Sequence, residues 1–250
     1  MSEVLEVKNA SKTASPTAKP ASVAPAWPSS LYATPRVQAW TTPLNESFVA
    51  EEIVEGCRLA IQHLGMDGLR SVGVTSSLRG EGRTTIAIAT ALVLAEYGLN
   101  TILLELDLAN PELAQRLAVA RFPGLGDLAE GRAILTDTIR PVVAGLSIIP
   151  AGVVQGSIPR ALSQLAKTEV LDTLVSEGHV IVADLPPLLG NSAGRQAAGL
   201  MADVILVVRA RVVPASSIIE AVGGLPVTPK VLVNGTKSRV PGWARRLSGV

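Results

Sequence analysis

The chain of 250 residues is 48% hydrophobic and carries 22 Lys and Arg residues against 21 Asp and Glu residues, for a formal net charge of +1. This balance gives no electrostatic reason to expect a nucleic-acid partner, and the apolar content is sufficient for a substantial core. A single cysteine, Cys57, excludes a disulfide framework within the chain and a multi-cysteine metal site, as is typical of the reducing cytoplasm. The sequence also lacks a signal-peptide pattern and any apolar run of about 18 residues, so we expect a soluble, cytoplasmic protein.

The first predicted elements are an arm and a helix. Residues 1–44 are rich in Ala, Ser, Thr and Pro without apolar periodicity, which predicts a disordered or extended arm. A helix is predicted to begin near Asn45, a candidate N-cap residue, because an apolar stripe follows at i+3 and i+4 spacing. A helix packed on the flank of a domain and an oligomerisation helix both fit this stripe. Its members are Val49, Ile53, Cys57, Ala60 and Leu64.

Residues 70–98 (RSVGVTSSLRGEGRTTIAIATALVLAEYG) are predicted to form a strand, a glycine-bearing loop and an apolar helix. A helix that starts at such a loop offers unpaired backbone N–H groups and the positive end of its dipole to an anion. The dinucleotide pattern requires a third glycine where Thr85 stands, whereas the P-loop pattern G-x-x-x-x-G-K-[ST] fits with two departures. Ser77 replaces the first glycine and Arg83 replaces the lysine, while Thr84 keeps the hydroxyl that binds Mg²⁺. From the loop alone, an ordinary surface turn remains the alternative.

The rest of the chain alternates apolar strands with helical segments. Uninterrupted Val, Ile and Leu runs are typical of parallel strands that are covered on both faces. The sequence therefore predicts one doubly wound α/β domain over residues 45–236, with a mostly parallel sheet, helices on both faces and a short basic tail at 237–250. Strands are predicted at 101–107, 146–150, 180–184, 204–208 and 230–234, short helical pieces at 124–140, and helices at 160–176 and from Pro214 onward.

Acidic residues follow two of these predicted strands. Glu105 and Asp107 end one strand and Asp184 ends another. Because ligands of open α/β sheets bind beyond the carboxyl ends of the strands, we expect these acids near the glycine-bearing loop. Thr84, Asp107 and Asp184 together offer the oxygen ligands that Mg²⁺ prefers. Glu105 and Asp107 alternate along the predicted strand, so we expect them to share one face of it. Two such neighbouring carboxylates raise each other's pKa unless a cation intervenes, which would suit one of them to accept a proton. The alternative is that all three acids are solvated loop residues.

Three segments resemble a known family in the same order along the chain. SVGVTSSLRGEGRTT, ILLELDLANP and HVIVADLPPLL are similar to the Walker A, Walker A′ and Walker B motifs of the CpsD/CapB-like bacterial tyrosine kinases, within the MinD/ParA class of P-loop ATPases. The resemblance covers about residues 46–236. It implies a P-loop NTPase fold that uses ATP and Mg²⁺, and phosphoryl transfer to tyrosine if the protein is active. It also implies a membrane-embedded chain-length regulator, a polysaccharide co-polymerase, as the partner in exopolysaccharide or capsule export. The protein would then be peripheral at the inner face of the membrane.

The resemblance also assigns roles to individual positions. It implies that Glu105 and Asp107 activate the tyrosine hydroxyl together with Arg83 as a catalytic group, and that Asn234 contacts the adenine edge. Glu55 and Arg58 match the start of the family's E-x-x-R-x-x-R oligomerisation helix, here within residues 46–64, although Ile61 replaces its last arginine. The implied magnesium ligands are Thr84, Asp107 and Asp184, and the implied nucleotide-binding residues are Gly80, Glu81, Gly82, Arg83, Thr84, Thr85 and Asn234.

The departures from the family pattern keep other functions open. Arg83 replaces the phosphate-binding lysine with a larger planar cation, and Glu105 replaces the first A′ aspartate. The family's C-terminal tyrosine cluster is missing from the sequence, so the expected phosphate acceptor is Tyr32 or a residue of another protein. One alternative is a non-catalytic, nucleotide-sensing adaptor of the same export system. Another is a positioning ATPase of the MinD/ParA kind, which usually carries a lysine where Leu78 stands.

Overall fold

The computed structural model describes residues 49–64 and 68–235. The predicted arm, the predicted tail and Tyr32 lie outside the described residues, and those predictions remain untested. Asn45 also lies outside them, but the predicted helix start near Asn45 is wrong, because Val49 and Ala50 are not helical and the helix begins at Glu51. The first described helix, α2, spans Glu51–Leu64. None of the helices within the described ranges is long and apolar enough to cross a membrane.

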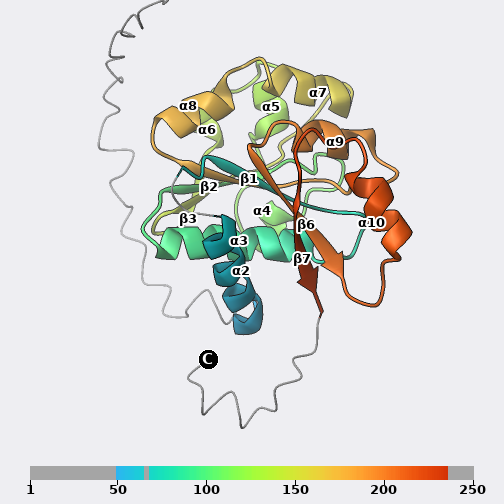
Figure 1. Cartoon of the computed structure of the whole chain (residues 1–250). Coiled ribbons are helices and arrows are strands. Elements are labelled where there is room, and N and C mark those ends of the chain that lie inside the picture. Colours follow the sequence, from blue (N-terminus) through green and yellow to red (C-terminus); the bar gives the residue numbers. More distant parts are fainter. Residues whose placement is uncertain (1–48, 65–67, 236–250) are drawn as a thin grey trace, which may run out of the picture. The chain divides into compact units, whose positions relative to one another are not determined.

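One sheet of seven strands forms the centre of the described part of the chain (Figure 1). Its spatial order is β3-β4-β2-β5-β1-β6-β7, and only β3 runs antiparallel to its neighbour. This confirms the predicted fold class of a doubly wound, mostly parallel sheet. The strands are β1 Ser71–Ser76, β2 Thr101–Glu105, β3 Arg140–Val143, β4 Leu146–Ile149, β5 Val180–Asp184, β6 Asp203–Arg209 and β7 Lys230–Asn234.

Two of the sequence predictions for strands need correction. The strand predicted at 101–107 ends at Glu105, so Asp107 lies beyond it and does not share a strand face with Glu105. The antiparallel strand β3 was not predicted, because its half-buried residues form a short hairpin with β4 rather than a continuous apolar run. The predicted strands at 180–184 and 230–234 coincide with β5 and β7.

The helices that follow α2 are mostly short. The single helix predicted at 160–176 is wrong, because Glu169 adopts a left-handed backbone conformation (φ 54°) that separates two helices. Neither α4 nor α9 was predicted, since each is too short to show a periodic pattern. The helices are α3 Arg83–Glu96, α4 Leu113–Arg116, α5 Leu125–Ala129, α6 Leu135–Thr138, α7 Ile158–Leu165, α8 Val170–Ser176, α9 Ser192–Ala198 and α10 Ala215–Val222.

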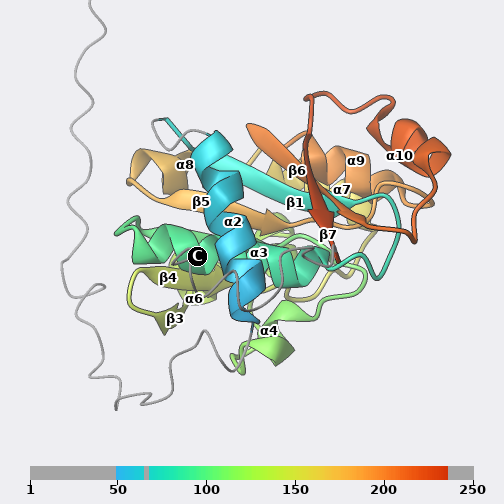
Figure 2. The same ribbon diagram turned by 60° about the horizontal axis from the view of Figure 1, so that its bottom comes forward.

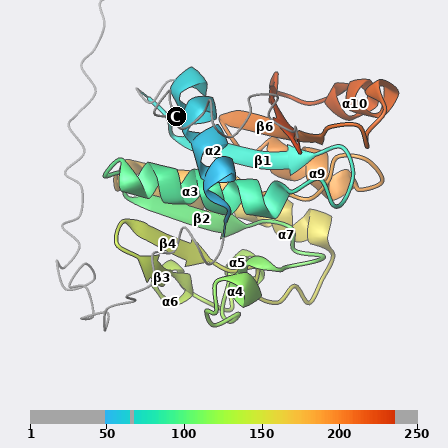
Figure 3. The same cartoon turned by 90° about the horizontal axis from the view of Figure 1, so that it is seen from below.

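Helices cover both faces of the sheet. On one face lies α3, whose residues are buried almost all the way round, and α2 crosses over it (Figures 2 and 3). The opposite face is covered by α5, α7, α8 and α9 (Figure 1). Successive residues of β2 pack into different clusters, Leu103 on the α3 side and Leu104 on the other, as alternation along a strand requires. The sheet is therefore buried on both sides.

The sheet register gathers the predicted site residues at one edge. Asp184 at the end of β5 is paired with Glu105 at the end of β2 and with Val74 of β1. The loop between β1 and α3 begins just beyond this level. The carboxyl ends of three neighbouring parallel strands thus bring the loop and the acids together, as expected for a ligand site in this kind of sheet.

Candidate functional site

The glycine-bearing loop, residues 77–82, is fixed by hydrogen bonds of Glu81 to its own backbone and to the ends of two strands that are distant in the sequence. Glu81 is only 1% exposed, and its carboxylate accepts hydrogen bonds from the backbone N–H of Leu78 (2.6 Å) and of Arg209 at the end of β6 (3.0 Å). Asn234, at the end of β7, donates from Nδ2 to the carbonyl of Glu81 (2.9 Å). The side chains of Glu81 and Asn234 therefore fix the conformation of the loop.

Gly82 caps α3 in a conformation that only glycine adopts easily. Its φ is 99°, and a Cβ atom at this position would overlap the amide nitrogen of Asn234. The helix starts directly after it, with the N–H of Ile86 donating to the carbonyl of Gly82 (3.0 Å). Gly80 also has a positive φ of 81°, but a Cβ there would meet nothing within 4 Å. The sequence pattern thus marks two glycines, and at Gly82 a Cβ atom would also force the Asn234 side chain to move.

Arg83 points from the first turn of α3 toward the strand ends. Its guanidinium donates through Nη1 to the carbonyl of Leu185, just after β5, and through Nη2 to Oδ2 of Asp107 (3.3 Å). The side chains of Arg83 and Asp107 are 11% and 6% exposed. The cation that replaces the P-loop lysine is therefore bound to an acid and a carbonyl of this chain.

Asp107 and Asp184 are buried carboxylates with unused hydrogen-bonding capacity. They are 4% and 3% exposed, and Oδ1 of each has no hydrogen-bond partner within the described part of the chain. Burial raises the pKa of Asp184 to about 7, against the opposing effects of the Arg83 charge and a hydrogen bond from the Thr84 side chain. Nearby Asp107 and Glu105 add to the rise. Such groups are stable as neutral acids or beside a cation.

These residues have the chemistry that a magnesium ion requires. Mg²⁺ is usually held by one or two carboxylates together with waters and phosphate oxygens, and a P-loop hydroxyl is a common further ligand. Asp107 and Asp184 each offer an unpaired oxygen, and the Thr84 side chain already bonds to Asp184. Within the described ranges, no group of three or more His, Cys, Asp and Glu side chains is arranged to hold a metal by itself. A metal here would therefore depend on the Thr84 hydroxyl and on a bound ligand.

Glu105 is 1% exposed, and both of its carboxylate oxygens accept hydrogen bonds from the backbone. Oε1 accepts from the N–H of Leu113 at the start of α4 (2.5 Å), and Oε2 accepts from the N–H of Ala151 after β4 (2.9 Å). Burial raises the pKa of Glu105, and these backbone hydrogen bonds oppose the rise. Glu105 and Asp107 thus have different partners, and Glu105 holds α4 against the sheet.

Arg116, the last residue of α4, belongs to none of the sequence motifs described above. Its Nη1 lies 3.4 Å from Oγ1 of Thr85, in the first turn of α3, and its Nη2 lies 2.7 Å from Oε2 of Glu112. Thr85, predicted to bind the nucleotide, thus has a cation beside its hydroxyl. The only signal in the sequence is the i, i+4 spacing of Glu112 and Arg116, which also occurs on ordinary helices.

The residues of the predicted oligomerisation helix have partners within the chain. Arg58 of α2 forms ion pairs with Glu55 on the same helix and with Glu96 at the end of α3, both at 2.9 Å.

Tyr97 follows α3 and is 40% exposed. It lies at the opposite end of α3 from the loop, roughly 20 Å away for a helix of this length. Tyr97 therefore cannot reach the site of its own chain.

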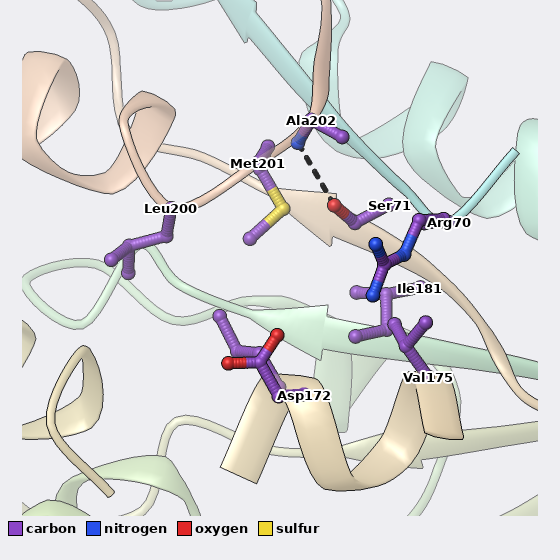
Figure 4. A pocket seen from close by; sticks show the side chains of 9 residues that line it. Arg70, Ser71, Asp172, Val175, Ile181, Leu200, Met201 and Ala202 are labelled. Carbon is purple, nitrogen blue, oxygen red and sulfur yellow. Dashed lines mark hydrogen bonds between the residues drawn. The ribbon is translucent and has the colours of Figure 1, made fainter. Parts of the chain in front are cut away.

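A hollow of about 260 Å³ lies away from this site, at the amino ends of the strands (Figure 4). Ser71 begins β1, and its Oγ accepts a hydrogen bond from the N–H of Ala202, just before β6 (2.9 Å). Arg70 lies at its rim on the β1 side, and Asp172 on the α8 side. The remaining lining residues are Leu171, Val175, Ile181, Leu200 and Met201. Because this hollow lies at the amino ends of the strands, it is separate from the loop and the acids at their carboxyl ends.

Comparisons with known proteins identify the relatives of this chain. No family model matches it. It is 29% identical over 156 residues to the tyrosine-protein kinase CpsD of Streptococcus agalactiae, which covers 61% of this chain and 67% of CpsD. It is also 29% identical over 160 residues to EpsB of Ralstonia solanacearum, assigned as a tyrosine-protein kinase, which covers 63% of this chain. That match spans only 21% of EpsB, about a fifth of its length.

Solved structures of proteins of the same kinds have a similar fold. The VpsO kinase domain superposes with a TM-score of 0.64 at 28% identity, covering 74% of this chain and 97% of that domain. MinD of Pyrococcus horikoshii, solved with Mg-ADP, gives a TM-score of 0.52 at 21% identity, covering 71% of this chain and 76% of that chain. The MinD match shows the shared fold alone.

Proposed function

Because this chain belongs to the CpsD- and EpsB-like bacterial tyrosine kinases within the MinD/ParA class of P-loop ATPases, we propose that it binds ATP with Mg²⁺ at the loop between β1 and α3. In this proposal it transfers a phosphoryl group to a tyrosine hydroxyl. The acceptor is Tyr32 or a tyrosine of another protein, since Tyr97 cannot reach the site of its own chain.

The observation that carries the proposal is the group formed by Thr84, Asp107 and Asp184. Two buried carboxylates each have an oxygen with no partner among the described residues, directly beside the first turn of a helix. Burying two carboxylate oxygens without hydrogen-bond partners costs free energy unless a cation or a ligand binds to them. A Mg²⁺ ion together with phosphate oxygens would complete both.

The chain's own residues would divide the work at this site. The Thr84 hydroxyl and the free oxygens of Asp107 and Asp184 would hold Mg²⁺, which when bound offsets the negative charge of the phosphates. Arg83 would keep Asp107 in place through its hydrogen bond and balance part of the buried negative charge. Glu81 and Asn234 would keep the loop in the shape that points its backbone N–H groups at the phosphates.

The membrane partner is proposed from the family alone. We propose that the protein acts with a membrane-embedded chain-length regulator in capsule or exopolysaccharide export and is recruited by that regulator to the inner face of the membrane. Co-expression of the two, followed by detection of phosphotyrosine, tests the kinase activity. The expected result is a signal that Thr84→Ala and Asp184→Ala remove. An equal signal from the wild type and both variants would overturn the assignment.

A second candidate is a nucleotide-sensing adaptor of the same export system that does not turn over ATP. The observation that favours it is the position of Arg83, which is bound to Leu185 and Asp107 instead of extending along the loop. An adaptor would bind Mg²⁺-ATP and alter polysaccharide chain length, yet yield no phosphotyrosine in the co-expression experiment. A phosphotyrosine signal that depends on Thr84 would exclude this candidate.

A further inference from the structure

The position of Arg83 leaves the phosphate site without the cation that a P-loop usually supplies. The Arg83 guanidinium contacts Asp107 and the carbonyl of Leu185, and its charge also stabilises ionised Asp184. To turn toward a phosphate, Arg83 would have to break its contacts with both Asp107 and the Leu185 carbonyl. In this position the Arg83 guanidinium pairs with Asp107, so a cation from another element could contact the phosphates.

Arg116 lies at the right place to be that cation. Its guanidinium contacts Oγ1 of Thr85 (3.4 Å), and Thr85 belongs to the first turn of α3, next to Thr84. The side chain is 45% exposed, so it can move toward a ligand that arrives from solvent. Its remaining partner is Glu112, which is 57% exposed. An exposed i, i+4 ion pair of this kind is weak and easily exchanged for a phosphate.

The fold fixes α4, and with it Arg116, relative to the loop. Glu105 is buried at the end of β2 and accepts the N–H of Leu113, the first residue of α4. Its other oxygen accepts the N–H of Ala151, so that the carboxylate is held from two sides. A buried acid fixed by two backbone hydrogen bonds is a rigid anchor. Glu105 is thus a positioning residue for the helix that carries Arg116.

We propose that Arg116 binds the phosphates of a nucleoside polyphosphate at the P-loop, as the cation that Arg83 does not provide, and that Glu112 holds Arg116 at this position in the absence of ligand. The proposal rests on nucleotide binding at this loop, as proposed above. It assigns to α4 a phosphate-binding role that the loop motif does not include. A charge-assisted hydrogen bond to phosphate can account for a tenfold or larger difference in affinity.

The test is a titration of Mg²⁺-ATP, followed by calorimetry, into the wild type, Arg116→Ala, Arg116→Lys and Glu112→Gln. We expect Arg116→Ala to weaken binding about tenfold or more and Arg116→Lys to weaken it less, because lysine keeps the charge. We expect Glu112→Gln to tighten binding up to about fivefold, because the competing carboxylate is lost. Asp172→Asn on α8 is the control, because it removes an exposed charge beside the hollow at the amino ends of the strands, and it should bind like the wild type.

The outcomes separate this inference from the proposed function. If the wild type binds Mg²⁺-ATP and Arg116→Ala binds equally well, the role of Arg116 is overturned while nucleotide binding stands. If the wild type binds no nucleotide, both are overturned. Because Arg116 is exposed, its substitution should leave the melting temperature of the unliganded protein unchanged, so a loss of affinity cannot be attributed to unfolding.

Discussion

Nη2 of Arg83 lies 3.3 Å from Oδ2 of Asp107, and both side chains are nearly buried. This pair connects the first turn of α3 with the segment after β2, two parts of the chain that the sequence motifs treat as separate. It places the residue that departs from the P-loop pattern against one of the acids expected to bind magnesium. The site is therefore organised around an internal ion pair.

Substitutions of Arg83 and Asp107 should have non-additive effects on the free energy of unfolding. Arg83→Ala leaves Asp107 buried without its cation, and we expect a loss of about 3 kcal/mol in the free energy of unfolding. Asp107→Asn removes the charge that needs balancing, so the double variant should lose clearly less than the sum of the two single variants. A double-mutant cycle by urea denaturation measures this difference. Additive losses would show that the two side chains do not interact.

Asp184 should make the stability of the metal-free protein depend on pH. Burial raises its pKa in the folded state to about 7, from the ordinary value of 3.8. Between these two pH values the folded protein holds a proton that the unfolded chain has released. The contribution of Asp184 to the free energy of unfolding is therefore full below about pH 4 and is lost as the pH rises through 7. Asp184→Asn cannot ionise, and its stability relative to the wild type should rise between pH 5 and pH 8. Unfolding curves at several pH values, without added metal, measure this. The exposed-acid control Asp172→Asn should parallel the wild type, and the same result for Asp184→Asn would contradict the prediction.

The two glycines of the loop should respond differently to alanine. Both have positive φ, so each substitution carries a backbone cost of about 1–2 kcal/mol. Gly82→Ala also places its Cβ against the amide of Asn234, whereas Gly80→Ala meets open space. We therefore expect Gly82→Ala to be the more destabilising substitution in thermal unfolding. Adding Asn234→Ala should restore part of that loss, although it also removes the hydrogen bond to Glu81.

Glu105 should contribute to stability through its backbone partners. Glu105→Ala leaves the buried N–H groups of Leu113 and Ala151 without acceptors, and we expect it to lower the free energy of unfolding by about 3 kcal/mol. Glu105→Gln retains one acceptor oxygen and should lose less. Denaturation of both variants checks this order. If Glu105→Ala were as stable as the wild type, the carboxylate would not anchor α4.

The fold followed from the sequence where apolar runs were uninterrupted. β5 and β7 coincide with their predicted ranges, because such runs show where a strand begins and ends. The direction of the Arg83 side chain was not predictable, since it depends on Leu185 and Asp107, which come from other strand ends. Arg116 was missed for a similar reason. Its significance depends on where Glu105 anchors α4, and a helix of four residues leaves no periodic pattern.

Binding of ATP and Mg²⁺ by the loop, Thr84, Asp107 and Asp184 underlies every role proposed above. The most direct test is a calorimetric titration of ATP into the wild type with and without Mg²⁺, beside Thr84→Ala, which removes one hydroxyl from a half-buried position. We expect micromolar binding that is stronger with Mg²⁺, and we expect Thr84→Ala to remove most of the gain in affinity due to the metal. No binding by the wild type, or binding that neither Mg²⁺ nor Thr84→Ala changes, would contradict it.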